Sequence, residues 1–223
     1  HEFSAWLVYE AGKSWAEADA DTAEAIDFME FYGREMMRLA ERQPLTRIPG
    51  EDNELYYIPL GVGVVIPPWN FPLAIFTGQV VAALVAGNCV LAKPAEQTPL
   101  IAAAAVRLLH QAGIPEDVLH LLPGDGAALG KALLPDARVA GVAFTGSNDT
   151  AKIINRTLAA REGAIVPLIA ETGGQNAMIV DSTALPEQVV NDILISSFQS
   201  AGQRCSALRV LFVQEEVADR TLR

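Results

Sequence analysis

The chain has 223 residues, of which 51% are hydrophobic and 19% are charged, as is typical of a globular protein with a large core and not of a disordered or fibrous one. Its net charge of −11 disfavours nucleic acids and anionic membranes as partners, because like charges repel. It contains only two cysteines, which excludes a disulfide framework and indicates a reducing, cytoplasm-like compartment.

The chain begins at His1, without an initiator methionine. No basic segment followed by an apolar stretch stands at this start, so we expect no signal peptide. We expect a piece of a longer protein whose beginning lies upstream.

The first predicted helix covers residues 21–43. Its apolar residues, among them Ala25, Phe28 and Tyr32, recur at steps of three and four, and Pro44 follows its end. Residues 49–52 have the composition of a turn.

No charged residue occurs from Leu55 to Ala92, a length that would suffice for a membrane helix. Prolines and glycines interrupt this run, however. A buried strand, helix and strand explain it better, because strands buried on both faces of a parallel sheet are continuously apolar.

From residue 62 onward, predicted strands and helices alternate. The strands are expected at residues 62–66, 89–92, 118–122, 139–145, 166–170, 177–180 and 207–213. The helices are expected at residues 72–86, 99–112, 127–134, 149–160 and 185–200. This alternation predicts an α/β fold, a Rossmann-like parallel sheet with helices on both faces.

Ligands of such sheets bind beyond the carboxyl ends of the strands. Four predicted strand ends carry polar residues or glycines: Pro67–Asn70, Lys93–Glu96, Pro123–Gly126 and Thr145–Ser147. Gly124, Gly126 and Gly130 fit either a phosphate-binding turn or an ordinary strand-to-helix turn. Likewise, Ser147 fits either a pyrophosphate site or a helix N-cap.

The pair Lys93 and Glu96 fits two interpretations. At a strand end, the two side chains are suited to hydrogen bonds with ribose hydroxyls. Taken alone, they are better explained by a solvated loop, since exposed charges are common on protein surfaces.

The two cysteines differ in their surroundings. Cys89 lies in an apolar strand and is expected to be a small buried side chain. Cys205 follows a predicted helix, in a glycine-containing turn beside Arg204, which favours a reactive thiolate. Glu171 ends an apolar strand before two glycines and is a candidate buried base. No histidine is close to Cys205 in sequence, so a Cys–His protease is poorly supported.

Five segments in this order resemble motifs of the aldehyde dehydrogenase superfamily: Pro68-Trp-Asn-Phe-Pro72, Lys93-Pro-Ala-Glu96, Phe144-Thr-Gly-Ser147, Glu171-Thr-Gly-Gly174 and Gly202-Gln-Arg-Cys205. The resemblance covers essentially the whole chain. Thr172 stands where most of the superfamily has leucine. With this form, the chain is most similar to the Δ1-pyrroline-5-carboxylate dehydrogenase group, including the domain of that kind in proline utilization A proteins.

The resemblance implies NAD-dependent oxidation of L-glutamate γ-semialdehyde to L-glutamate in proline catabolism. Cys205 would be the nucleophile, Asn70 and the backbone N–H of Cys205 the oxyanion donors, and Glu171 the base that activates water. Phe71 and Ser206 would line the substrate pocket. It implies no metal. The expected cofactor-binding residues are Ile66, Pro68, Trp69, Lys93, Ala95, Glu96, Gly126, Gly130, Phe144, Thr145, Gly146, Ser147, Thr150, Thr172 and Gly173.

Residues 1–173 are expected to hold the N-terminal helices and the NAD-binding domain, and residues 174–223 the start of a truncated catalytic domain. The resemblance implies a small-molecule aldehyde as partner, a homo-oligomer and an upstream proline dehydrogenase domain. Two alternatives remain: a dehydrogenase of another aldehyde, and an inactive cofactor-binding fragment. Glu96 favours NAD over NADP, because a carboxylate repels the 2′-phosphate.

Overall fold

The computed structural model describes residues 1–222, and the chain forms two compact units, His1–Glu171 and Thr172–Arg223. The first unit contains α1 (Glu2–Ala11), α2 (Trp15–Ala40), β1 (Val62–Ile66), α3 (Ala74–Val85), β2 (Cys89–Ala92), α4 (Pro99–Gln111), β3 (Leu119–Leu121), α5 (Gly126–Leu133), β4 (Val139–Gly146), α6 (Asn148–Ala159) and, reaching one residue beyond it, β5 (Leu168–Thr172). The second contains β6 (Asn176–Val180), α7 (Pro186–Phe198), the 3₁₀ helix η1 (Gln199–Gly202), β7 (Leu208–Val213) and α8 (Glu215–Leu222).

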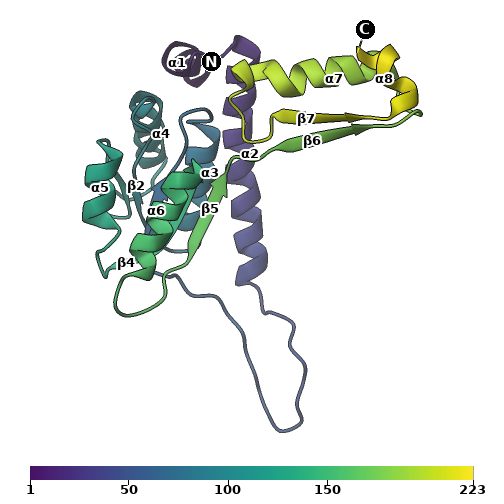
Figure 1. Ribbon diagram of the computed structural model, residues 1–223. Helices are drawn as coiled ribbons and strands as arrows, with labels where there is room; N and C mark the ends of the chain where they lie inside the picture. Colours follow the sequence, from purple (N-terminus) through teal and green to yellow (C-terminus); the bar gives the residue numbers. More distant parts are fainter. Residues whose placement is uncertain (223) are drawn as a thin grey trace. The chain divides into compact units, whose positions relative to one another are not determined.

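The first unit is built on a five-stranded sheet with the order β3-β2-β1-β4-β5 (Figure 1). Strand β1 pairs in parallel with β2 on one side and with β4 on the other. The chain therefore adds strands outward from β1 to β3, and then returns to β1 and continues in the opposite direction. The predicted parallel α/β sheet is confirmed.

Helices cover both faces of this sheet. Val64 and Val65 are neighbours in β1 and point to opposite faces. Val65 packs in a core with apolar residues of α1, α2, α3 and α4. Val64 packs in a second core with residues of β4 and α6.

Helix α2 begins earlier and ends earlier than predicted. Ser14 and Glu17 form a capping box, in which the Glu17 N–H donates to Ser14 Oγ (3.3 Å) and the Ser14 N–H donates to Glu17 Oε2 (3.2 Å). This fixes the start at Trp15. Helix α2 packs closely on α3, since a Cβ added to Gly78 would lie 2.9 Å from Phe28 Cδ2.

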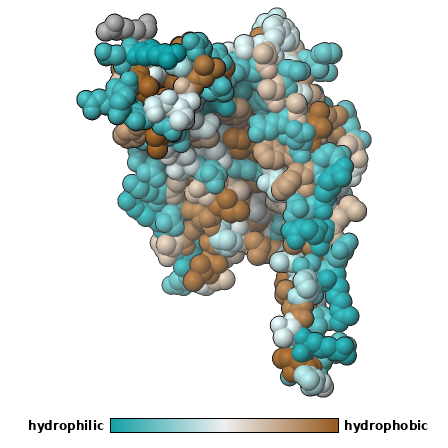
Figure 2. Space-filling model, turned by 90° about the vertical axis from the view of Figure 1, so that its right-hand side faces the viewer, coloured by the Kyte–Doolittle hydropathy of each residue, from teal (hydrophilic) through white to brown (hydrophobic). Residues whose placement is uncertain are grey.

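Residues 41–60, here called the arm, form no helix or strand and connect α2 to β1. They are almost entirely exposed, including Leu55, Tyr56 and Ile58. The arm is the lowest part of the chain in Figures 1 and 2, where hydrophobic side chains in brown lie beside hydrophilic ones in teal.

The second unit is a parallel crossover in which β6 and β7 pair and α7 connects them. Its small core includes Val180, Val189 and Leu208. Among residues 1–222, no helix is long and apolar enough to span a membrane. The uncharged run from residue 55 to 92 contains the end of the arm, β1, α3 and β2.

Candidate active site and cofactor site

The strand order changes direction at β1, since β2 and β3 lie on one side of it and β4 and β5 on the other. In sheets of this kind, ligands bind beyond the carboxyl ends of the strands at this point. The loop after β1, from Pro67 to Phe71, and the end of β4 both lie at these carboxyl ends. Gln79 of α3 donates a hydrogen bond from Nε2 to Thr145 Oγ1 (2.9 Å), which ties α3 to the end of β4. This edge of the sheet is therefore the candidate position for a bound cofactor.

Lys93 and Glu96 form a polar cluster after β2. Lys93 is buried, with 7% of its surface exposed, and its Nζ lies 3.4 Å from Glu96 Oε1. The same oxygen accepts a hydrogen bond from the Gly126 N–H (2.7 Å), at the first residue of α5. The solvated-loop interpretation is therefore wrong for Lys93: the chain holds this ammonium group at the strand end.

The cluster fits a cofactor. A Cβ added to Gly126 would lie 3.1 Å from Glu96 Oε1 and 3.4 Å from Lys93 Nζ, so a side chain at this position would crowd both groups. A lysine and a carboxylate side by side suit the paired hydroxyls of a ribose, which both donate and accept hydrogen bonds. Gly126 also opens α5, as predicted for the strand-to-helix turn, and Asp125 caps that helix.

Ser147 is the N-cap of α6. The Thr150 N–H donates to Ser147 Oγ (3.2 Å), and the Ser147 hydroxyl contacts Thr150 Oγ1 (2.9 Å). The capping interpretation is thus confirmed, and the start of α6 still has the positive end of the helix dipole, which favours an anion. Gly146, the residue before Ser147, packs closely on the Phe144 ring, since a Cβ added to Gly146 would lie 2.6 Å from Phe144 Cζ.

The remaining predicted cofactor residues occupy different environments. Ile66, Pro68 and Ala95 are half-buried at strand ends, and Trp69 is exposed. Phe144 is buried in the core with α6, so its side chain supports the sheet. Gly130 lies within α5, while Thr172 and Gly173 belong to the second unit.

The loop that carries Asn70 and Phe71 rests on a buried ion pair that the sequence analysis missed. Lys13 Nζ lies 2.9 Å from Asp21 Oδ2, with side-chain exposures of 5% and 0%, and 3.9 Å from the centroid of the Phe71 ring. Asp21 Oδ1 accepts a hydrogen bond from the Ala74 N–H (2.7 Å) at the start of α3.

Burial raises the pKa of Asp21 above its usual range, and the attraction of Lys13 opposes this shift. The available signal was Asp21 itself, because it lies four residues before Ala25 on the apolar face of a helix, where a carboxylate needs a partner.

Cys205 is exposed and lies on a turn that follows η1, as predicted. Asn176 donates from Nδ2 to the carbonyl oxygens of Cys205 (2.7 Å) and Ala207 (3.0 Å). Arg209 donates from Nη2 to the Gly202 carbonyl (2.5 Å). Ser206, the other predicted residue of this turn, is also exposed.

Two expectations about burial are wrong. Glu171 lies in β5, as expected, but it is exposed in this chain. Cys89 is half-buried in β2 instead of fully buried.

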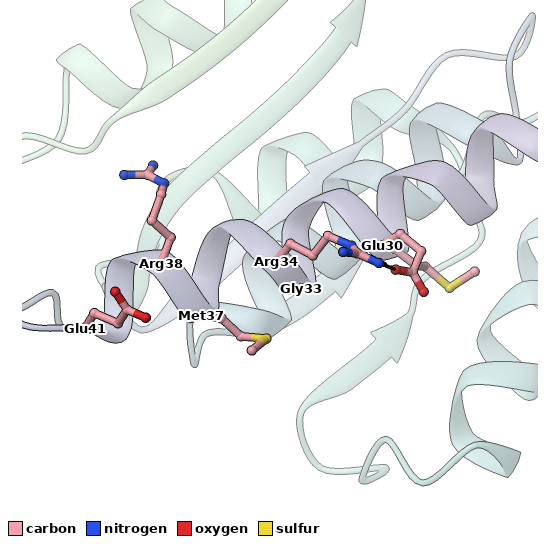
Figure 3. Close-up of a pocket in the computed structure, with 7 residues that line it drawn as sticks. Glu30, Gly33, Arg34, Met37, Arg38 and Glu41 are labelled. Atoms are coloured by element: carbon pink, nitrogen blue, oxygen red, sulfur yellow. Dashed lines mark hydrogen bonds and ion pairs between the residues drawn. The ribbon is translucent and has the colours of Figure 1, made fainter.

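A shallow hollow on α2 contains none of the predicted site residues. It is lined by Met29, Glu30, Gly33, Arg34, Met37, Arg38 and Glu41. Figure 3 shows Arg34 extended toward Glu30, with which it forms an ion pair (2.9 Å). The lining comes from α2 and from Glu41 at the start of the arm, and the Arg34–Glu30 ion pair neutralises two of its charges. The candidate chemistry therefore lies at the strand ends and on the Cys205 turn.

The chain is similar to known proteins along its whole length. The model of the family described as "Aldehyde dehydrogenase family" matches residues 1–223. The chain is 58% identical to the bifunctional protein PutA of Klebsiella aerogenes, over 97% of this chain and 16% of that protein. It is 51% identical to a 1-pyrroline-5-carboxylate dehydrogenase of Geobacillus thermodenitrificans, over 100% of this chain and 44% of that protein.

Among solved structures, the chain is similar to that of 1-pyrroline-5-carboxylate dehydrogenase from Thermus with bound NAD. The TM-score is 0.95 at 41% identity, over 99% of this chain and 44% of that one. The chain thus spans less than half the length of each of these relatives.

Proposed function

The chain belongs to the aldehyde dehydrogenase family, and we propose that the enzyme containing it oxidises L-glutamate γ-semialdehyde, the open form of Δ1-pyrroline-5-carboxylate, to L-glutamate with NAD. One observation carries the proposal. Along its whole length the chain is 51% identical to a protein named 1-pyrroline-5-carboxylate dehydrogenase, and it presents Cys205 on an exposed turn.

In this proposal, the Cys205 thiolate attacks the aldehyde carbon, and the carbonyl π electrons move to oxygen. The Asn70 amide and the Cys205 N–H donate hydrogen bonds to this oxyanion, as preorganised donors do in acyl transfer. NAD, held by the residues named below, would supply the oxidant that accepts a hydride from the same carbon, and the oxyanion electron pair would then re-form the C=O bond to give a thioester. Glu171 then takes a proton from water as the water attacks the thioester, and the C–S bond breaks to release glutamate and the thiolate.

For the cofactor, Lys93 and Glu96 would hold the adenosine ribose beside Gly126. Trp69 and Ser147 would contact the pyrophosphate, where the N-terminus of α6 favours negative charge. The NAD bound in the similar Thermus structure supports this choice.

The substrate is tested with the full-length enzyme. We expect kcat/KM for L-glutamate γ-semialdehyde to exceed those for succinate semialdehyde and hexanal, by roughly 100-fold or more, since a site built for polar groups rejects analogues that lack them. The rate of NADH formation gives kcat/KM for all three aldehydes. Cys205→Ala should abolish turnover and leave NAD affinity within about twofold. A preference for another aldehyde would overturn the substrate, and turnover by Cys205→Ala would overturn the nucleophile.

Glu96 provides a test of cofactor choice. Its carboxylate should repel the 2′-phosphate of NADP, so the wild-type enzyme should prefer NAD in kcat/KM. Glu96→Gln keeps the size of the side chain and removes the charge, and should narrow this preference by about tenfold. Glu116→Gln, at an exposed carboxylate outside the Lys93–Glu96 cluster, is the matched control and should leave the preference unchanged. Equal use of both cofactors by the wild-type enzyme would contradict the ribose assignment.

Further parts of the proposal concern the whole protein. A proline dehydrogenase domain in the same polypeptide is supported by the similarity to proteins named bifunctional. A homo-oligomer is supported by the exposed apolar side chains of the arm. A reducing, cytoplasmic location is supported by two free thiols.

A further inference from the structure

The backbone just before Cys205 has an unusual conformation. Ser200 (φ 54°, ψ 37°) and Ala201 (φ 53°, ψ 28°) are both left-handed, and Gly202 follows with φ 67°. They are the only non-glycine residues with positive φ in the part of the chain that the structure describes. Residues with a side chain adopt this conformation at a cost, so it persists only where the surroundings hold it.

Two side chains hold this turn at its two ends. Arg209 donates from Nη2 to the Gly202 carbonyl (2.5 Å), and Asn176 donates from Nδ2 to the Cys205 carbonyl (2.7 Å). The segment from Gly202 to Cys205 is therefore fixed at its first and last carbonyl groups. The backbone between these two carbonyl groups therefore has little freedom, and the directions of the Cys205 thiol and N–H are restricted with it.

Both donors belong to the same pair of strands, β6 and β7. Asn176 is the first residue of β6 and pairs with Leu208 of β7, which directly precedes Arg209. Gly202 is closely fitted as well, since an added Cβ would lie 2.8 Å from the Ser197 carbonyl oxygen at the end of α7. A site on paired strands keeps its geometry better than one on loops alone.

We propose that Asn176 and Arg209 are positioning residues that hold the strained turn of Cys205 in the conformation needed for attack on the aldehyde. The inference rests on the proposed role of Cys205 as nucleophile. Neither side chain takes part in bond making. They set the directions of the thiol and of the Cys205 N–H, and a displacement of about 1 Å at a reacting group can cost 100-fold in rate.

The first measurement is hydrogen exchange in the full-length enzyme. The Gln203 N–H donates to the Ser200 carbonyl (2.9 Å) and the Ala207 N–H to the Arg204 carbonyl (3.2 Å), so these two amides report on the turn. In the variants Asn176→Ala and Arg209→Met, we expect the amide hydrogens of Gln203 and Ala207 to exchange about tenfold faster than in the wild type, because one hydrogen bond is lost. Gln188→Ala on α7 and Arg220→Met on α8 are matched controls that should exchange like the wild type.

The second measurement is the first-turnover burst of NADH after rapid mixing. A positioning role lowers the burst rate constant, by roughly 10- to 100-fold, at an amplitude near one per folded site. A merely structural role lowers the amplitude through loss of folded enzyme and leaves the rate constant unchanged. Asn176→Ser and Arg209→Lys keep a donor, and should recover part of the rate.

Exchange at Gln203 and Ala207 within twofold of the wild type, or a burst rate constant within twofold, would overturn the proposal. If Asn176→Ala does not fold, Arg209→Met answers the same question from the other end of the turn. If Cys205→Ala keeps its turnover, the proposed function fails instead, and the exchange data still decide whether Asn176 and Arg209 hold the turn.

Discussion

At the scale of single residues, Cys205 and Glu171 have different tasks in the proposed reaction. The thiol is needed to form the covalent intermediate, whereas a base is needed only when water attacks the thioester. Both side chains are exposed in this chain, so burial keeps neither the aldehyde from Cys205 nor water from Glu171.

Glu171→Gln in the full-length enzyme separates these tasks. The substitution keeps size and shape but removes the base, so a full first-turnover burst of NADH should precede a steady rate that is about 10²- to 10⁴-fold slower. Stopped-flow absorbance measures both phases. Absence of the burst in the folded variant would mean that Glu171 also acts before hydride transfer, whereas a normal steady rate would remove it from the mechanism.

Residue types and spacing were sufficient to predict the candidates but not their environments. The Lys93 side chain looked like a solvated charge, because its burial depends on Glu96 and on the start of α5, 33 residues away. Asn176 and Arg209 were not predicted. Their role depends on the pairing of β6 with β7, which places two distant polar side chains beside one turn.

At the scale of elements, the junction of α1 and α2 supports the loop between β1 and α3. The buried Lys13–Asp21 pair contacts this loop at the Phe71 ring and at the start of α3. A buried ion pair is costly to break, because removal of one partner leaves the other charge without compensation.

Lys13→Met should therefore destabilise the chain by about 3 kcal/mol at neutral pH. The double variant with Asp21→Asn should regain part of that loss, since the amide oxygen can still accept the Ala74 N–H. Urea unfolding followed by tryptophan fluorescence measures both, because Trp6, Trp15 and Trp69 all belong to the first unit.

This loss should also depend on pH. Burial already raises the pKa of Asp21, and removal of the cation raises it further. A carboxyl whose folded pKa is raised stabilises the fold at low pH and loses that contribution as pH rises from its usual value through the raised one. The Lys13→Met variant should therefore approach the wild type in stability near pH 4. A loss that is the same at pH 4 and pH 8 would show that packing, not charge, accounts for it.

The alternation of strands and helices was predictable because its signals are local. Apolar runs and turn residues predicted all the strands and most of the helices, and the structure confirms them. Helix α1 was missed although Phe3, Trp6 and Leu7 have helical spacing and Gly12 caps its end. Helix α2 starts six residues before its predicted start, because the capping box of Ser14 and Glu17 fixes its first turn at Trp15.

At the scale of the molecule, the order of the strands could not be derived from local patterns. Whether β4 pairs with β1 or with β3 depends on contacts across the whole unit, and so does the separation of β6 and β7 into a sheet of their own. The second unit exposes large apolar side chains, among them Ile179, Phe198 and Phe212.

We expect residues 172–223 not to fold in isolation, whereas residues 1–171 should fold. A sheet of two strands is marginal in water, and a unit of this size buries too little apolar surface to offset its chain entropy. Circular dichroism and the dispersion of amide NMR signals would distinguish the two pieces. A cooperative thermal transition of the 172–223 piece would contradict this expectation.

The arm has a consequence for the integrity of the first unit. Its backbone belongs to no helix or strand, and Arg42 and Arg47 are exposed on it, as a trypsin-like protease requires. Cleavage there would leave α1 and α2 on a separate polypeptide. Leu7, Ala18 and Ala25 of that piece lie in the same apolar core as β1 and α3, so the two halves would stay associated without a covalent link. The first unit could then be reassembled from two separately made fragments, divided at a loop that contributes nothing to its sheet.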